Sequence, residues 1–231
     1  MASGDQKHVY DSAAILNGKV SADYRGSRAD IDPVAVQTNL NLHFKNKLPS
    51  KKKYNYNVMN TNLILNYVLF KTGDEFQKIL DKTFKEKAKI KYPVYFYKKK
   101  ALKEEGNADP MFYATRYDYL RIAKAIMDDY QNDTCVGKYL KTIFDNRIEK
   151  ENDKRRKEGK KVQWVQARGY AGQFQTHYKG ISKKRPVMGM GGRAGQHIVI
   201  DFERSRIVVT NSLYDNFNYE KIIFKTIKKG K

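Results

Sequence analysis

Residues 196–210 read QHIVID-FERS-RIVVT and predict a β-hairpin. Two runs rich in Ile and Val flank the polar segment from Phe202 to Ser205, which can supply the turn between antiparallel strands. His197 alternates with apolar residues inside the first run, so we expect it to be a structural residue of a strand. The hairpin places a β-sheet in the last third of the chain.

The residues on either side of this hairpin extend the β-rich region. Upstream, residues 162–165 and 170–178 each predict a strand, and residues 219–229 form an amphipathic pattern typical of a short closing helix. The glycine cluster at residues 189–195 reads GMGGRAG and leads directly into the hairpin. It fits either a flexible loop or a loop that shapes a catalytic edge strand, because glycine lets a backbone approach a ligand closely.

The middle of the chain has the periodicity of helices. The first predicted helix spans residues 59–72, and a second begins after a possible N-cap at Asp74. The third runs from Thr115 to Tyr130 and the fourth from Val136 to Ile148. Thr115 with Asp118 matches a capping box. Residues 89–96 favour a strand, residues 98–109 a charged loop, and residues 149–161 a solvated helix end or loop.

The order of these elements predicts an α+β fold with a helical region, an antiparallel sheet and a closing C-terminal helix. We expect a single domain over residues 1–231. Its parts are a loop-rich segment (1–58), a mainly helical segment (59–160), and the sheet with its closing helix (161–231).

The composition excludes several classes of protein. One cysteine, Cys135, rules out an internal disulfide, and the sequence has no Cys/His cluster for a metal. The longest uncharged run, residues 54–70, contains five asparagines, so no membrane span is expected. The first residues lack the basic and apolar regions of a signal peptide. Neither a metal nor a cofactor is predicted.

The net charge of +21 comes from 46 Lys and Arg against 25 Asp and Glu. Such an excess fits either a lysine-rich protein without a charged partner or one that binds a polyanion. Only 12 of the cations are arginine, the residue that reads base edges, and no recognised nucleic-acid motif surrounds them. Nucleic acid is therefore not the expected partner.

Four segments carry a resemblance to a known family. They are Met1-Ala2-Ser3-Gly4, the block 53–57 with its helix ending at Lys71-Thr72-Gly73, the helix start 114–118, and Gly192-Arg193-Ala194-Gly195-Gln196 with the hairpin that follows. In order and spacing they resemble the serine β-lactamase and penicillin-binding-protein-like hydrolases, including the esterase and amide-hydrolase branch.

The resemblance implies acyl transfer through a serine ester. The family's nucleophile is the Ser of a Ser-x-x-Lys segment, which precedes the Met-x-Ser-Gly segment. We therefore expect this chain to be the C-terminal part of such a hydrolase and to be inactive alone. Ser50-Lys51-Lys52-Lys53 has the same spacing, but it takes the place of a family turn after Pro49, and we do not assign it as nucleophile.

The same resemblance assigns the site residues. Tyr56 takes the place of the general base, and the backbone N–H of Gln196 that of an oxyanion donor. Substrate contacts fall to Asn57 and to the triplet Arg193, Ala194 and Gly195. Val58 departs from the family, which has Ser or Asn there, and Arg193 cannot act as a base.

The predicted substrate is a small amide or ester. One alternative is a binding protein on the same fold that has lost catalysis, because the catalytic triplets depart from the family pattern. Another is a basic nucleic-acid-binding module. An exposed edge of the sheet predicts self-association. The compartment stays open, although relatives often work in the periplasm or outside the cell.

Overall fold

The computed structural model describes residues 54, 64, 68, 71–72, 75–92, 95–98, 110–150, 167–192, 196–211 and 219–228. The chain divides into two compact units. The sheet unit comprises residues 1–2, 52–55 and 115–231, and the hairpin unit comprises residues 3–51 and 56–114. Each unit is described by itself, and the single domain over residues 1–231 stays a prediction.

The hairpin unit contains a helix and a two-stranded sheet. Helix α4 (Phe76–Asp81) continues into the π-helical segment η3 (Lys82–Lys87), as the apolar spacing predicted. Strand β1 (Tyr95–Lys98) pairs antiparallel with β2 (Pro110–Tyr113), so the strand expected over 89–96 begins later than predicted. Residues 64, 68, 71 and 72 are helical, in agreement with the predicted helix over 59–72, and Asp74 lies outside the described residues.

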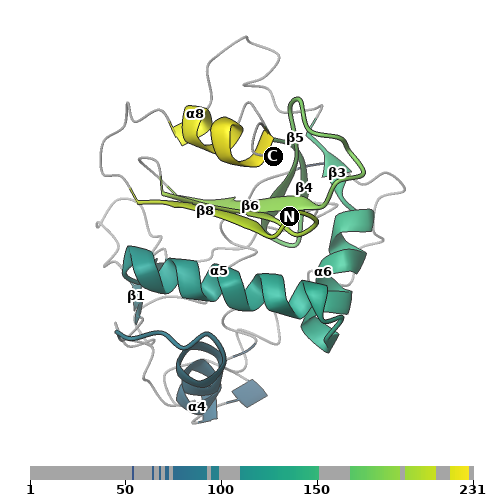
Figure 1. The fold of residues 1–231 in the computed structure, drawn as a ribbon. Coiled ribbons are helices and arrows are strands. Elements are labelled where there is room, and N and C mark those ends of the chain that lie inside the picture. Colours follow the sequence, from purple (N-terminus) through teal and green to yellow (C-terminus); the bar gives the residue numbers. More distant parts are fainter. Residues whose placement is uncertain are drawn as a thin grey trace, which may run out of the picture. The chain divides into compact units, whose positions relative to one another are not determined.

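The sheet unit is built on six antiparallel strands in the order β3-β4-β5-β6-β7-β8 (Figure 1). The strands are β3 (Ile148–Glu149), β4 (Ala167–Ala171), β5 (Phe174–Tyr178), β6 (Val187–Gly191), β7 (His197–Asp201) and β8 (Arg206–Thr210). Each strand pairs with the next one along the chain. The α+β class and the hairpin of β7 and β8 are therefore confirmed.

Three features of the sheet differ from the prediction. Residues 170–178 are not one strand but parts of β4 and β5, because Gly172 and Gln173 both have positive φ and reverse the chain. Part of the glycine cluster belongs to β6, where a Cβ at Gly189 would overlap the Tyr178 hydroxyl. Ile148 starts β3 instead of ending a helix.

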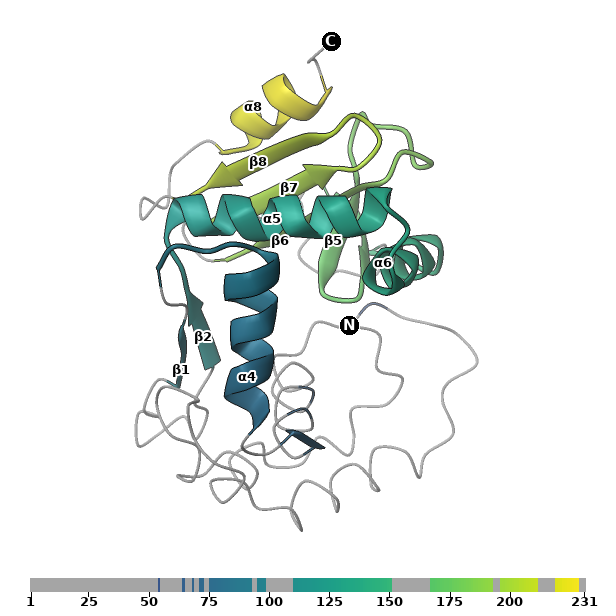
Figure 2. The ribbon, with the colours of Figure 1, turned by 60° about the horizontal axis from the view of Figure 1, so that its bottom comes forward.

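Two helices cover one face of this sheet. Helix α5 (Arg116–Gln131) begins at Thr115, whose side chain accepts a hydrogen bond from the Asp118 N–H, so the predicted cap is confirmed. Helix α6 (Cys135–Asp145) crosses α5 so closely that a Cβ at Gly137 would overlap the Asp129 carbonyl. Figure 2 shows α5 lying along β7 and β8.

A hydrophobic cluster lies beneath α5 and α6. Its buried residues are Ala123, Met127, Leu140, Phe144, Phe174, Met188, Ile198, Ile200 and Phe202. Partly buried hydrophobic side chains pack around this cluster, and the rings of Tyr130 and Phe202 stack 4.1 Å apart. The two helices are therefore held to the sheet by hydrophobic burial.

The closing helix covers the opposite face (Figure 1). It consists of α8 (Tyr219–Ile223) and the π-helical η5 (Phe224–Lys228), which confirms the predicted C-terminal helix. Ile223 and Ile227 are buried in a second core, whereas Ile222 is exposed. That core comprises Ala167, Tyr178, Val187, Val199, Val208, Tyr219, Ile223 and Ile227.

Candidate functional site

The connection from β6 to β7 is the predicted substrate edge. The two strands pair from Val187 opposite Asp201 to Gly191 opposite His197. Beyond them, the Gly192 N–H donates to the Gln196 carbonyl over 2.7 Å, which closes the base of the loop. Gln196 is half-buried at the start of β7. The loop residues Arg193, Ala194 and Gly195 lie outside the described residues, so the oxyanion and substrate-anchor roles stay predictions.

Tyr56 and Asn57 also lie outside the described residues, but the nearby Tyr54 is described. Its ring meets the ring of Tyr170 edge-on at 5.3 Å. The ammonium of Lys150 lies 5.3 Å from the centre of the Tyr54 ring and 5.7 Å from that of Tyr170. Tyr54 is thereby held against the β4 strand of the sheet.

Lys150 corrects the expectation that residues 149–161 are solvated. Its side chain is only 3% exposed and donates a hydrogen bond to the Gln175 side-chain carbonyl. Two aromatic faces and an amide oxygen offset part of the cost of burying an ammonium. Glu149 likewise belongs to strand β3. Sequence reasoning missed this cluster because its members come from four separate segments.

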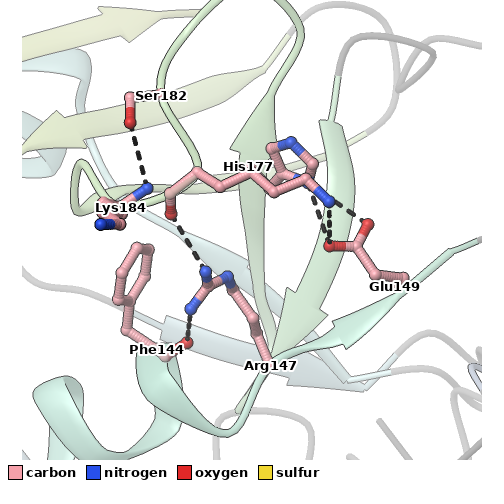
Figure 3. Close-up of polar contacts among 7 residues, drawn as sticks. Phe144, Arg147, Glu149, His177, Ser182 and Lys184 are labelled. Carbon is pink, nitrogen blue, oxygen red and sulfur yellow. Dashed lines mark hydrogen bonds and ion pairs between the residues drawn. The ribbon is translucent and has the colours of Figure 1, made fainter.

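A second polar cluster surrounds His177 on β5 (Figure 3). Its Nδ1 lies 3.2 Å from each carboxylate oxygen of Glu149, and the Lys183 ammonium lies 3.4 Å from one of them. His177 is buried and has a positive φ of 52°, which is uncommon for a residue other than glycine. Sequence reasoning assigned no role to His177, because its partner Glu149 is 28 positions away in the chain and the pair has no recognisable spacing.

Burial governs the protonation of His177. Desolvation lowers its pKa below the ordinary value, although the Glu149 carboxylate acts in the opposite direction. A neutral imidazole that donates Nδ1–H to Glu149 keeps Nε2 as a proton acceptor. The ring nitrogen that points away from Glu149 in Figure 3 could therefore act as a base toward a group that reaches it.

The surroundings of this pair are fixed by Arg147. Its guanidinium donates to the Phe144 carbonyl over 2.6 Å and to the Lys183 carbonyl over 3.0 Å. These bonds join the end of α6 to the loop between β5 and β6 (Figure 3). The Ser182 hydroxyl accepts a further hydrogen bond from the Lys184 N–H, so the loop conformation is locally specified.

His197 is the most buried histidine among the described residues. It is 2% exposed, and its ring lies 3.8 Å from the ring of Tyr219 on the closing helix. Burial lowers the pKa of His197 to about 4. Burial also raises the pKa of the neighbouring Tyr178 phenol. The predicted structural role of His197 agrees with this packing between sheet and helix.

The described residues provide neither a metal-binding cluster nor a membrane-spanning helix. Within those ranges, no group of three or more His, Cys, Asp or Glu side chains is arranged to hold a metal ion. None of the described helices has the length and apolar character needed to cross a bilayer, in agreement with the sequence.

Comparisons of the chain with protein families, with curated proteins and with solved structures give no match.

Proposed function

We propose that the chain forms the substrate-edge part of a serine hydrolase that cleaves amide or ester bonds of small molecules through an acyl-enzyme. The observation that carries the proposal is the β6–β7 connection, where a glycine-rich strand end is closed onto Gln196. The order of helices, antiparallel sheet and closing helix is consistent with the β-lactamase-like fold that the four sequence segments resemble.

In this proposal each residue of the edge has one task. The N–H of Gln196 donates to the oxygen of the scissile carbonyl as negative charge develops on it. The Arg193 guanidinium binds a substrate carboxylate. The Tyr56 phenolate accepts the proton of the attacking serine hydroxyl and returns it to the leaving group. Ala194, Gly195 and Asn57 contact the substrate.

The attacking serine belongs to a Ser-x-x-Lys segment, which in the family's order precedes Met1-Ala2-Ser3-Gly4. The test is to express the reading frame that includes the codons upstream of Met1 and to treat it with a fluorophosphonate. Intact-mass spectrometry should show one adduct on that frame and none on residues 1–231. The Ser→Ala variant of the upstream Ser-x-x-Lys is the control.

Two outcomes would overturn the hydrolase. An adduct on a serine within residues 1–231, such as Ser50, would place the nucleophile elsewhere. An upstream frame without Ser-x-x-Lys, or one that forms no adduct, would favour the alternative of a binding protein on the same fold.

The role of Arg193 has its own test. Arg193→Met should raise KM for a substrate with a carboxylate at least tenfold more than for its methyl ester, because only the carboxylate pairs with the guanidinium. Arg204→Met is the matched control, since Arg204 lies in the β7–β8 turn at the other end of β7. Equal losses on both substrates would remove Arg193 from the substrate site.

Self-association is proposed for the sheet edge. In the part of the chain that the structure describes, β8 pairs with β7 and with no second strand. The main-chain N–H and C=O groups of an edge strand can pair with another chain. Light scattering on residues 1–231 should give a mass above 26.9 kDa that rises with concentration. A constant monomer mass would contradict this proposal.

A further inference from the structure

The cationic side chains of the sheet unit are distributed unevenly between its two faces. On α5 and α6, four of the five have acidic partners within the same helices or the turn between them, Lys138 sharing Asp133 with Lys141, while Arg116 lies over the Tyr117 ring. The pairs are Arg121 with Asp118 at 2.9 Å, Lys124 with Asp128 at 2.6 Å, and Lys141 with Asp133 at 2.7 Å. Residues 115–150 contain seven Lys and Arg against six Asp and Glu, so this face is nearly neutral.

The region that carries the opposite face has a large excess of positive charge. The described residues from 167 to 228 contain ten Lys and Arg against three Asp and Glu. Six of these cations are exposed lysines, which we call the lysine face: Lys179, Lys183, Lys184, Lys221, Lys225 and Lys228. Lys179, Lys184, Lys225 and Lys228 form no ion pair with a described residue.

Two segments far apart in the sequence meet to form the lysine face. The Lys228 side chain lies against Gly180, where an added Cβ would come 3.0 Å from the Lys228 Cε. Arg185 reinforces the junction by donating to the Ile227 carbonyl over 2.9 Å. The loop from β5 to β6 and the closing helix therefore present their lysines side by side.

The arrangement along the closing helix keeps its lysines on one side. Lys221, Lys225 and Lys228 are all exposed, whereas Tyr219, Ile223 and Ile227 of the same helix are buried in the core. Like charges held this close repel one another, and an anion placed over them relieves that repulsion.

We propose that the lysine face binds the phosphate backbone of a nucleic acid without reading its sequence. Lysines neutralise phosphates and release condensed counterions, which provides affinity without base contacts. Among the ten cations of this region the exposed arginine is Arg204, so most of the exposed positive charge is lysine, whereas base reading favours arginine. The proposal is independent of the hydrolase and adds a partner that the net charge alone did not assign.

An anionic membrane is the competing partner, and the packing of the closing helix disfavours it. Helices that bind bilayers place an apolar side into the lipid. Here Tyr219, Ile223 and Ile227 are 7% exposed or less because they fill the core, whereas Ile222 is exposed and Phe224 is half-buried. The helix therefore offers charge but little apolar surface.

The test compares two triple variants with the same change in net charge. Lys179→Gln/Lys225→Gln/Lys228→Gln removes three lysines from the lysine face, and Lys124→Gln/Lys138→Gln/Lys141→Gln removes three from the α5–α6 face. Fluorescence anisotropy with a labelled duplex DNA of arbitrary sequence measures affinity across a series of salt concentrations. Circular dichroism melts verify that both variants fold.

The unmodified chain should bind the duplex more weakly as salt rises. The lysine-face variant should weaken binding at least tenfold at low salt and reduce the slope of log K against log salt by up to about 2.7, at roughly 0.9 per lost phosphate contact. The control variant should stay within about threefold of the unmodified chain, since its lysines are already paired with aspartates.

Three results would overturn the proposal. Absence of binding at low salt would exclude a polyanion site. Equal losses of DNA affinity in the two variants would mean that the net charge of the chain, and not the position of its lysines, determines binding. Binding to vesicles that contain phosphatidylserine, with the same dependence on the lysine-face variant and without DNA binding, would assign the face to a membrane.

Discussion

The two faces of the six-stranded sheet are covered by helices in different ways. Beneath α5 and α6 lies a hydrophobic cluster, and α5 also buries the carboxylates of Asp118 and Asp129, which are bound to Arg121 and Thr134. Beneath α8 and η5 the apolar core is accompanied by ionisable groups. The buried His197 and the pair of Arg185 with Asp201 lie there. The buried ionisable groups of the α5–α6 face are carboxylates, whereas the α8 face also buries the His197 ring, which can take up a proton.

The α8 face combines a buried ion pair, which stabilises the fold, with exposed lysines on its surface. Asp201 is fully buried and accepts hydrogen bonds from Arg185, whose guanidinium also reaches a carbonyl of the closing helix. The exposed lysines on that side have few such partners. Among the described residues of the sheet unit, the excess positive charge is therefore concentrated in the region that carries the α8 face: residues 167–228 have ten cations against three acidic side chains, and residues 115–150 have seven against six.

The largest expected effect comes from breaking the buried pair on the α8 face. Arg185→Met leaves the Asp201 carboxylate buried without its partner and frees the Ile227 carbonyl. Urea unfolding should show a loss of about 3–5 kcal/mol in the free energy of unfolding. The control Arg206→Met removes a half-buried guanidinium that donates to the Thr226 carbonyl, and it should cost about 1 kcal/mol. Equal losses of stability in the two variants would mean that leaving the Asp201 carboxylate without Arg185 costs no more than losing the hydrogen bond of Arg206.

Acid should weaken the same face through His197. The pKa of His197 is about 4 in the folded chain and about 6.5 in the unfolded one, so the unfolded state binds the proton more tightly. The stability that neutral His197 provides is complete above pH 6.5 and falls as the pH drops toward 4. The expected loss is about 3 kcal/mol between pH 7 and pH 4.

The variant His197→Phe isolates this effect because it keeps an aromatic ring against Tyr219 and cannot titrate. The free energy of unfolding, measured in urea at pH 7 and at pH 4, should fall by about 3 kcal/mol less in the variant than in the unmodified chain. The same pH dependence in both proteins would mean that His197 is not the group responsible.

The α5–α6 face should respond strongly to a change in packing at the helix crossing. Gly137→Ala places a methyl group into the Asp129 carbonyl at the helix crossing, so α6 must move away from α5. We expect a loss of about 1–3 kcal/mol from thermal melts, unchanged between pH 7 and pH 5. Lys138→Ala, at the next exposed position of α6, is the control and should change stability by less than about 0.5 kcal/mol. A stable Gly137→Ala variant would contradict the close crossing.

The smallest expected effects concern exposed charges on the two faces. Lys124→Ala breaks its ion pair with Asp128 and should cost about 0.3–0.5 kcal/mol at low salt, less at high salt. Lys225→Ala should leave stability unchanged or raise it slightly, since it removes a cation from a cluster of like charges. Melts of both variants at low and high salt test the contrast, and identical behaviour would contradict the difference between the faces.

Local patterns in the sequence were sufficient to predict much of the fold. The alternating hairpin of β7 and β8, the capped helix α5 and the closing helix each carry their signal within a short window. Strand β6 was missed because its glycines resemble a loop, and Gly189 is required there by the Tyr178 hydroxyl from a neighbouring strand. The break between β4 and β5 was missed because Gln173 adopts the left-handed conformation there without being glycine.

The candidate site was less accessible to sequence reasoning. Gln196 stands at the base of the predicted loop, while Tyr56, Asn57, Arg193, Ala194 and Gly195 lie outside the described residues. The pairing of His177 with Glu149 and the enclosure of Lys150 by two tyrosines join residues far apart in the chain. Neither has a spacing signal, since tertiary folding alone brings these side chains together.

Arg185 and Arg206 donate hydrogen bonds to the carbonyls of Ile227 and Thr226, respectively. The last turn of the closing helix is therefore needed to provide both acceptors. A premature termination codon before position 227 would delete a fully buried isoleucine and, with it, the carbonyl acceptor of Arg185. Deletion clones for expression should therefore retain the chain through Lys228.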